Sequence, residues 1–308
     1  MSARLQIALS MMGICIVFAL SFLVFGYLKT WHFFYLNPMI PPFADTCTIT
    51  YGAESVKLGN DPMINNPADP WGRRMNYPRI WQYLYKLGLK KEHTYLFGIL
   101  LVFSYLIGII LFVPRKLSLK SQIIVLFSSF SPAALSGIER GNTDLLLFFI
   151  ASLCIAISKS KNIYYKFTSY LLVLLGFLLK LFPIFGVVIY LKERKKNVVA
   201  IFVISILFCF LYGVLFYNDL YLIKSATPMT YQGTYGINTL GLAASMVNEN
   251  LGRIINILSV IMVIAGIGIV VHSIRTRRLF LNEKISNYLD GFRMGSGIFL
   301  GTFLLGTN

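Results

Sequence analysis

Four long apolar runs constrain this chain more than any other feature. They cover roughly residues 5–28, 94–113, 198–217 and 254–272, and each is long enough to cross about 30 Å of hydrocarbon as a helix. The first run follows only Arg4 and lacks a small-residue cleavage site, so we expect it to remain as a membrane helix. The runs predict a polytopic membrane protein.

The composition excludes a soluble domain of this size. Of 308 residues, 56% are hydrophobic and only 13% are charged, which predicts an all-α bundle of membrane helices. The net charge of +16 could suit nucleic acid, but the basic residues cluster in short loops beside the apolar runs. We therefore attribute the charge to membrane orientation and predict no nucleic-acid partner.

The basic clusters predict the topology. They lie at Arg4 and near residues 115–120, 159–166, 192–196 and 275–278, and the positive-inside rule places all five in the cytoplasm. Two cytoplasmic segments are separated by an even number of crossings, so the chain must go out and return between residues 120 and 159. We predict that it leaves over about 121–138, turns at the non-cytoplasmic sequence ERGNTD (139–144) and returns over 145–158.

The same rule predicts a turn inside the apolar run 167–191. We place it near Lys180, Phe182 and Pro183, which leaves arms of only about 16–21 Å at 1.5 Å per residue. Such a turn must dip below the outer surface and line a cavity. The alternative is one 25-residue helix with Lys180 snorkelling or paired inside the bundle.

Two outer loops are predicted, at about 29–93 and 218–253. In the first, residues 45–60 read as a helix with Asp45 as a candidate N-cap and Gly59 as a stop. Residues 79–93 read as an amphipathic helix that lies along the membrane surface, with Ile80, Leu84 and Leu87 on one face. The second loop is polar and rich in Thr, Tyr and Gly.

Several motifs follow one another along most of the chain: an acid that opens a short helix (FADTCTITYGAESVKLGNDP), then NYP, ERGNTD and LKLFPIF. In this order they resemble the polyprenyl-phosphate-dependent membrane glycosyltransferases of glycosyltransferase family 87. The resemblance implies the GT-C fold in a single membrane-embedded domain, 1–308. Family members are usually longer, and the chain stops at the end of an apolar run, so we expect a C-terminal truncation.

The resemblance implies transfer of a hexose, with mannose one candidate, from a polyprenyl-phosphate sugar to a glycolipid or glycan, with inversion. Phosphate is a weakly basic leaving group, so a carboxylate base and a few cations form the minimum set, without a cofactor. The first-loop acid of such enzymes is the base, which assigns that role to Asp45. The alternative is that Asp45 only caps its helix.

Arg140 and Lys180 are the candidate ligands of the donor phosphate, because both lie at turns predicted to dip into the outer leaflet. The alternative is an internal ion pair of Arg140 or Lys180 with Glu139 or Asp144. Arginines near NYP could bind lipid phosphate. The further candidates for substrate contacts are Glu139, Asn142, Asp144, Tyr77, Arg79, Asn60, Asp61 and Asn238.

The three histidines lie apart, so no metal site is predicted. We expect the inner membrane of a bacterium, with the active site facing outward and a role in cell-envelope glycan biosynthesis. Two other classes stay open: a transporter or flippase of lipid-linked oligosaccharide, and a scaffold or inactive fragment. A pocket built from separate loops leaves no linear signature that would name the sugar or the acceptor.

Overall fold

The computed structural model describes residues 2–228, 237–276 and 283–305. Within those ranges all regular secondary structure is helical, which confirms the predicted all-α membrane bundle. Its contacts divide the chain into two units, Met1–Met75 with Arg79–Ala156 and Asn76–Pro78 with Ile157–Asn308. The single domain stays a prediction.

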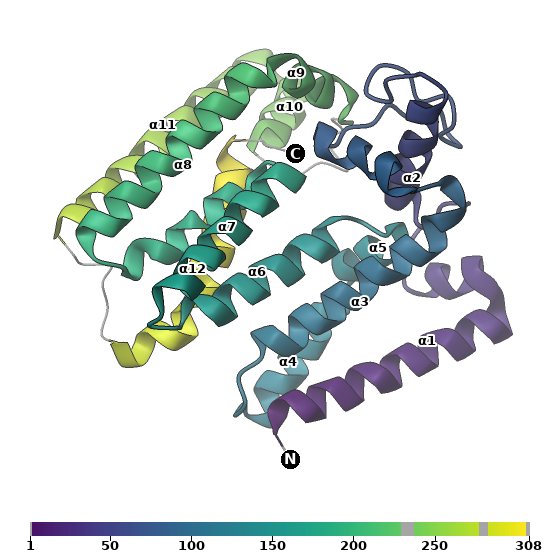
Figure 1. Ribbon diagram of the computed structural model, residues 1–308, viewed down its shortest axis with the longest axis horizontal. Coiled ribbons are helices and arrows are strands. Elements are labelled where there is room, and N and C mark those ends of the chain that lie inside the picture. Colours follow the sequence, from purple (N-terminus) through teal and green to yellow (C-terminus); the bar gives the residue numbers. More distant parts are fainter. Residues whose placement is uncertain (1, 229–236, 277–282, 306–308) are drawn as a thin grey trace. The chain divides into compact units, whose positions relative to one another are not determined.

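In the part of the chain that the structure describes, the first unit contains eight helices, of which the last, α6, ends just beyond the unit; 3-10 helices are labelled η. They are α1 (Ala3–Phe33), α2 (Ala44–Lys57), η1 (Arg79–Leu87), η2 (Lys91–His93), α3 (Thr94–Phe112), α4 (Leu119–Ser129), α5 (Pro132–Arg140) and α6 (Asp144–Ser158). The long α1 and α3 and the shorter α4 lie side by side (Figure 1). The core of this unit contains Ile7, Met11, Leu101, Tyr105, Ile109, Val113 and Leu145.

The two ends of this unit differ as the topology predicted. At one end the Arg4 side chain donates to the Val113 carbonyl at 2.7 Å, and the amide of Ala3 donates to the Arg115 carbonyl. At the other end α2 meets the start of α3 through the Thr50 and Thr94 hydroxyls, 2.7 Å apart. The first basic clusters therefore share the end away from α2.

The segment predicted to lead into ERGNTD is bent rather than straight. The axes of α4 and α5 differ by 46° across a short break. Ser131 caps α5 and Pro132 occupies its first position, where the missing N–H costs no helical hydrogen bond. The proline thus starts a new helix instead of continuing α4. The returning segment, α6, has the predicted bounds to within one residue.

The first outer loop holds the predicted short helix, α2, and Gly59 follows its end with a positive φ of 81°. The predicted amphipathic helix is instead two 3-10 pieces, η1 and η2. In η1 Trp81 and Gln82 are buried, whereas Leu87 of the predicted apolar face is 82% exposed. Gln82 donates to Asp61 at 3.2 Å, so the side of η1 that carries Gln82 faces Asp61.

The second unit contains α7 (Ile163–Leu179), η3 (Phe182–Lys192), α8 (Lys195–Leu215), α9 (Tyr217–Ala226), α10 (Ile237–Val247), α11 (Glu249–Thr276) and α12 (Glu283–Leu305). The start of α7 meets the end of η3, because the Lys166 ammonium lies 2.7 Å from the Glu193 carboxylate. The Ser169 and Tyr190 hydroxyls are also 2.7 Å apart. α7 and η3 therefore form an antiparallel hairpin that turns at Lys180, as parity predicted, and the single long helix is excluded.

Among the residues that the structure describes, four helices are apolar and long enough to cross a membrane: Ala3–Phe33, Lys91–Phe112, Lys195–Leu215 and Glu249–Gly266. They correspond to the four predicted runs. The second predicted outer loop is largely helical, because α9, α10 and the start of α11 occupy most of it. α12 packs along η3, where Gly297 and Gly301 leave room for Val188 and Phe185.

Candidate active site

The helix that carries Asp45 begins in an unusual way. Its N-cap is Phe43, which has a left-handed backbone (φ 61°) and makes no side-chain capping bond. Asp45 lies in the first turn of α2, inside the helix rather than at its cap position, so the capping alternative is wrong. Without a capping side chain, the turn is held by contacts with distant parts of the chain.

The ERGNTD turn supplies the closest of these contacts. The Asn142 side-chain amide donates to Asp45 Oδ2 at 2.7 Å. The other polar atom of that amide, Oδ1, accepts from the backbone N–H of Asp144 at 2.8 Å. Because Oδ1 faces the Asp144 N–H, the NH₂ group must face Asp45, so the turn fixes which end of the amide meets the carboxylate.

Arg140 lies on the other oxygen of the same carboxylate. Its Nη1 is 3.8 Å from Asp45 Oδ1, and the two side chains are 45% and 14% exposed. Its only other polar neighbour in the described part of the chain is the Met39 sulfur, 3.7 Å from Nη2. Both contacts are long for an arginine, which leaves most of the guanidinium edge free for an anion. The internal ion pair of Arg140 is therefore with Asp45.

Glu139 turns away from Arg140 and holds the loop in front of α2. Its side chain is buried, and Oε1 accepts from the Tyr27 hydroxyl at 2.7 Å and from the Met39 amide at 2.9 Å. The Glu139 carbonyl accepts from the Phe43 amide at 3.2 Å. One residue thus joins α1, the loop and α5, and leaves Arg140 to face Asp45.

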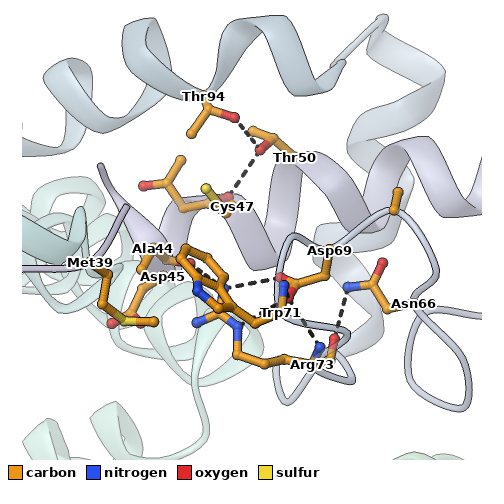
Figure 2. A network of polar contacts seen from close by, with 12 residues as sticks. Met39, Ala44, Asp45, Cys47, Thr50, Asn66, Asp69, Trp71, Arg73 and Thr94 are labelled. Carbon is orange, nitrogen blue, oxygen red and sulfur yellow. Dashed lines mark hydrogen bonds and ion pairs between the residues drawn. The ribbon is translucent and has the colours of Figure 1, made fainter. Parts of the chain in front are cut away.

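The residues on both sides of Asp45 are anchored too. The Thr46 hydroxyl donates to the Gly141 carbonyl at 2.7 Å, and Arg73 Nη2 donates to the Ala44 carbonyl at 2.6 Å. Figure 2 shows that Arg73 lies between Asp69 and Trp71. Its guanidinium is 3.0 Å from the buried Asp69 carboxylate and 4.3 Å from the centre of the Trp71 ring. Because Asp69 and Trp71 hold the Arg73 side chain in place, its hydrogen bond to the Ala44 carbonyl anchors the first turn of α2.

Lys180 lies in the second unit, at the turn between α7 and η3. Its ammonium is 5.8 Å from the centre of the Tyr77 ring and 5.6 Å from that of Phe182. A cation over the face of an aromatic ring is stabilised by about 0.5–2 kcal/mol. The structure therefore joins two motifs that the sequence listed separately, NYP and LKLFPIF.

The other predicted residues fall into separate groups. Asp61 accepts from Arg79 at 3.0 Å in a salt bridge, and Asn60 bonds the Leu58 carbonyl at 3.4 Å. Asp144 is the first residue of α6. Asn238 is the second residue of α10, and its side chain lies outside the described part of the structure.

Sequence reasoning missed Tyr27, Phe43 and Thr46. Tyr27 lies at the end of an apolar run, where an interfacial tyrosine needs no special explanation. The left-handed backbone of Phe43 leaves no trace in its residue type. Gly141, which is left-handed and follows a short helix, is the one signal that could have pointed to a close approach of this turn to another segment.

Comparison with known proteins bears on this site. A family model described as glycosyltransferase family 87 matches residues 93–285. The matched segment contains ERGNTD and Lys180, whereas Asp45 precedes it. Searches of curated proteins and of solved structures each found no match.

Proposed function

The chain belongs to glycosyltransferase family 87 and is a membrane glycosyltransferase; from this premise we propose that it transfers a hexose from a polyprenyl-phosphate sugar to a glycolipid or glycan, with inversion and with Asp45 as the base. The observation that carries the proposal is the contact of one carboxylate, Asp45, with both Asn142 and Arg140. A base and an adjacent cation are what this transfer requires.

In the proposed step an acceptor hydroxyl attacks the anomeric carbon from the side opposite the phosphate. The new C–O bond forms as the bond to the phosphate oxygen breaks, and the phosphate keeps the electron pair. Asp45 takes the proton of the attacking hydroxyl. Since Asn142 donates to Oδ2, we assign the proton transfer to Oδ1, which Arg140 contacts only loosely at 3.8 Å.

Cations balance the charge that develops on the leaving phosphate. Arg140 is suited to this, because its guanidinium is exposed and only loosely paired. We assign the same task to Lys180, whose ammonium rests on Tyr77 and Phe182. An ammonium is a compact positive charge with three N–H donors, which suits it to bind an anion. Because the basic clusters are expected in the cytoplasm, we propose that the site faces outward from a bacterial inner membrane.

The test is transfer by membranes that contain the protein, supplied with radiolabelled polyprenyl-phosphate sugars one at a time. Wild type should incorporate one of the sugars. Asp45→Asn should lower the rate at least about a thousandfold, the upper part of the range for general-base removal. Glu54→Gln, on the same helix and in a loose pair with Lys57 at 3.8 Å, is the matched control and should retain activity.

Full activity of Asp45→Asn would remove Asp45 from the base role. Transfer from nucleotide sugars alone would overturn the proposed donor. A transporter predicts a third result, in which reconstituted vesicles move the lipid-linked sugar across the bilayer and form no glycosidic bond.

A further inference from the structure

The Phe43 ring fills a slot between two glycines on different helices. A Cβ built on Gly98 of α3 would lie 2.5 Å from the Phe43 ring, and one built on Gly141 would lie 2.9 Å from it. Such distances are far below van der Waals contact, so the ring fits only because both positions lack a side chain. Tyr95 meets the same ring edge-on at 6.4 Å between centroids.

The backbone of Phe43 is held as firmly as its ring. Its φ of 61° is uncommon for an aromatic residue, and such a conformation persists only where the surroundings impose it. Its amide donates to the Glu139 carbonyl, and its carbonyl accepts from the Cys47 amide at 2.9 Å. Phe43 therefore links α3, the ERGNTD turn and the first turn of α2.

We propose that Phe43 is a positioning residue: by wedging between Gly98 and Gly141 it sets the first turn of α2 so that Asp45 meets Asn142 and Arg140. Asp45 is two residues further along the chain, and its backbone follows the direction that Phe43 imposes. The packing of Phe43 between the two glycines is argued from contacts alone. Its effect on sugar transfer rests on the proposed function.

The decisive variant is Gly98→Ala. Alanine favours a helix interior over glycine, so on propensity alone the change should be harmless. Its methyl group nevertheless enters the space of the Phe43 ring, and the ring must leave the slot. Gly13→Ala is the matched control, because a Cβ at Gly13 of α1 meets nothing within 4 Å.

Cys47 reports on the wedge without any enzyme assay. Its thiol is buried in α2, and burial raises its pKa to about 12, so it should react very slowly with a maleimide at pH 7.5. Cys154 in α6 is equally buried and serves as the internal reference. Labelling of each cysteine is measured on the full-length protein in detergent by mass spectrometry of its peptide.

In Gly98→Ala we expect the labelling rate of Cys47 to rise about tenfold or more, while that of Cys154 stays at the wild-type value. Gly13→Ala should leave both rates unchanged. The double variant Phe43→Leu/Gly98→Ala restores space in the slot and should bring Cys47 back toward the wild-type rate. A Cys47 rate unchanged by Gly98→Ala, or one that rises in parallel with Cys154, would overturn the wedge.

Sugar transfer then tests the positioning role. Gly98→Ala should lower kcat about ten- to a hundredfold with little change in the KM for the donor, and the double variant should recover most of the loss. Normal kcat in a variant whose Cys47 is opened would show that the wedge does not position Asp45. If wild type transfers no sugar, the proposed function fails, whereas the Cys47 rates still decide whether the wedge exists.

Discussion

The Asn142 side-chain amide donates a hydrogen bond of 2.7 Å to the Asp45 carboxylate across 97 residues of sequence. This bond joins the helix of the first outer loop to the ERGNTD turn and selects one carboxylate oxygen. The amide is oriented in turn by the backbone N–H of Asp144. The ERGNTD turn thus orients one carboxylate, that of Asp45.

Loss of the Asn142 amide should impair sugar transfer more than stability. A hydrogen bond to a charged group contributes about 1.5–3 kcal/mol, so Asn142→Ala should reduce kcat about ten- to a hundredfold if the Asp45 geometry depends on it. The control is Asn65→Ala, an exposed asparagine of the first outer loop. Equal kcat values in the two variants would show that sugar transfer does not depend on the Asn142 amide.

Two substitutions distinguish the hydrogen bonds that Glu139 accepts from its negative charge. Glu139→Gln keeps an oxygen that can accept from Tyr27 and Met39, whereas Glu139→Ala leaves both donors unsatisfied at a cost of about 1–3 kcal/mol each. We expect Ala, but not Gln, to lower Tm in detergent by several degrees. If Gln abolishes transfer at an unchanged Tm, Glu139 contacts substrate instead.

We expect the face of the Tyr77 ring to stabilise the Lys180 ammonium by a cation–π contact. Tyr77→Phe preserves that face and should leave the KM for the donor near wild type, whereas Tyr77→Ala should raise it about three- to thirtyfold. Lys180→Ala should raise it further, because the ammonium itself is lost. A large effect of Tyr77→Phe would point to a contact of the hydroxyl with sugar.

A buried ion cluster should hold α12 against η3. Asp290 is 1% exposed, and its carboxylate lies 2.6 Å from the Lys192 ammonium and 3.3 Å from the Arg293 guanidinium. Asp290→Ala removes the carboxylate that both cations contact, and we expect a loss of about 3–5 kcal/mol in the free energy of unfolding, measured by denaturant titration.

The control for Asp290 is an exposed ion pair of the same unit. Glu249 and Arg253 lie 3.9 Å apart on the surface of α11, where solvent screens their attraction. Glu249→Ala should leave the unfolding midpoint unchanged. A similar midpoint for Asp290→Ala would mean that the cluster does not stabilise the packing of α12.

The sequence by itself determined the membrane class, the four spans and two turns. Apolar length fixes a span, because the bilayer core has a set thickness, and the charge clusters fix parity. Parity alone located the Lys180 turn inside a run that reads as one helix, and it placed ERGNTD at the end of the first unit that carries α2. These conclusions need only local composition and counting.

Only the tertiary structure decided which polar groups meet. Asn142 and Arg140 reach Asp45, whereas Glu139 turns to Tyr27 and Met39. Residue type could not show this, because neighbouring residues on a short helix point in different directions and their partners lie about a hundred positions away. The left-handed start of α2 was hidden for the same reason: Phe43 adopts it because Glu139, Gly98 and Gly141 surround it.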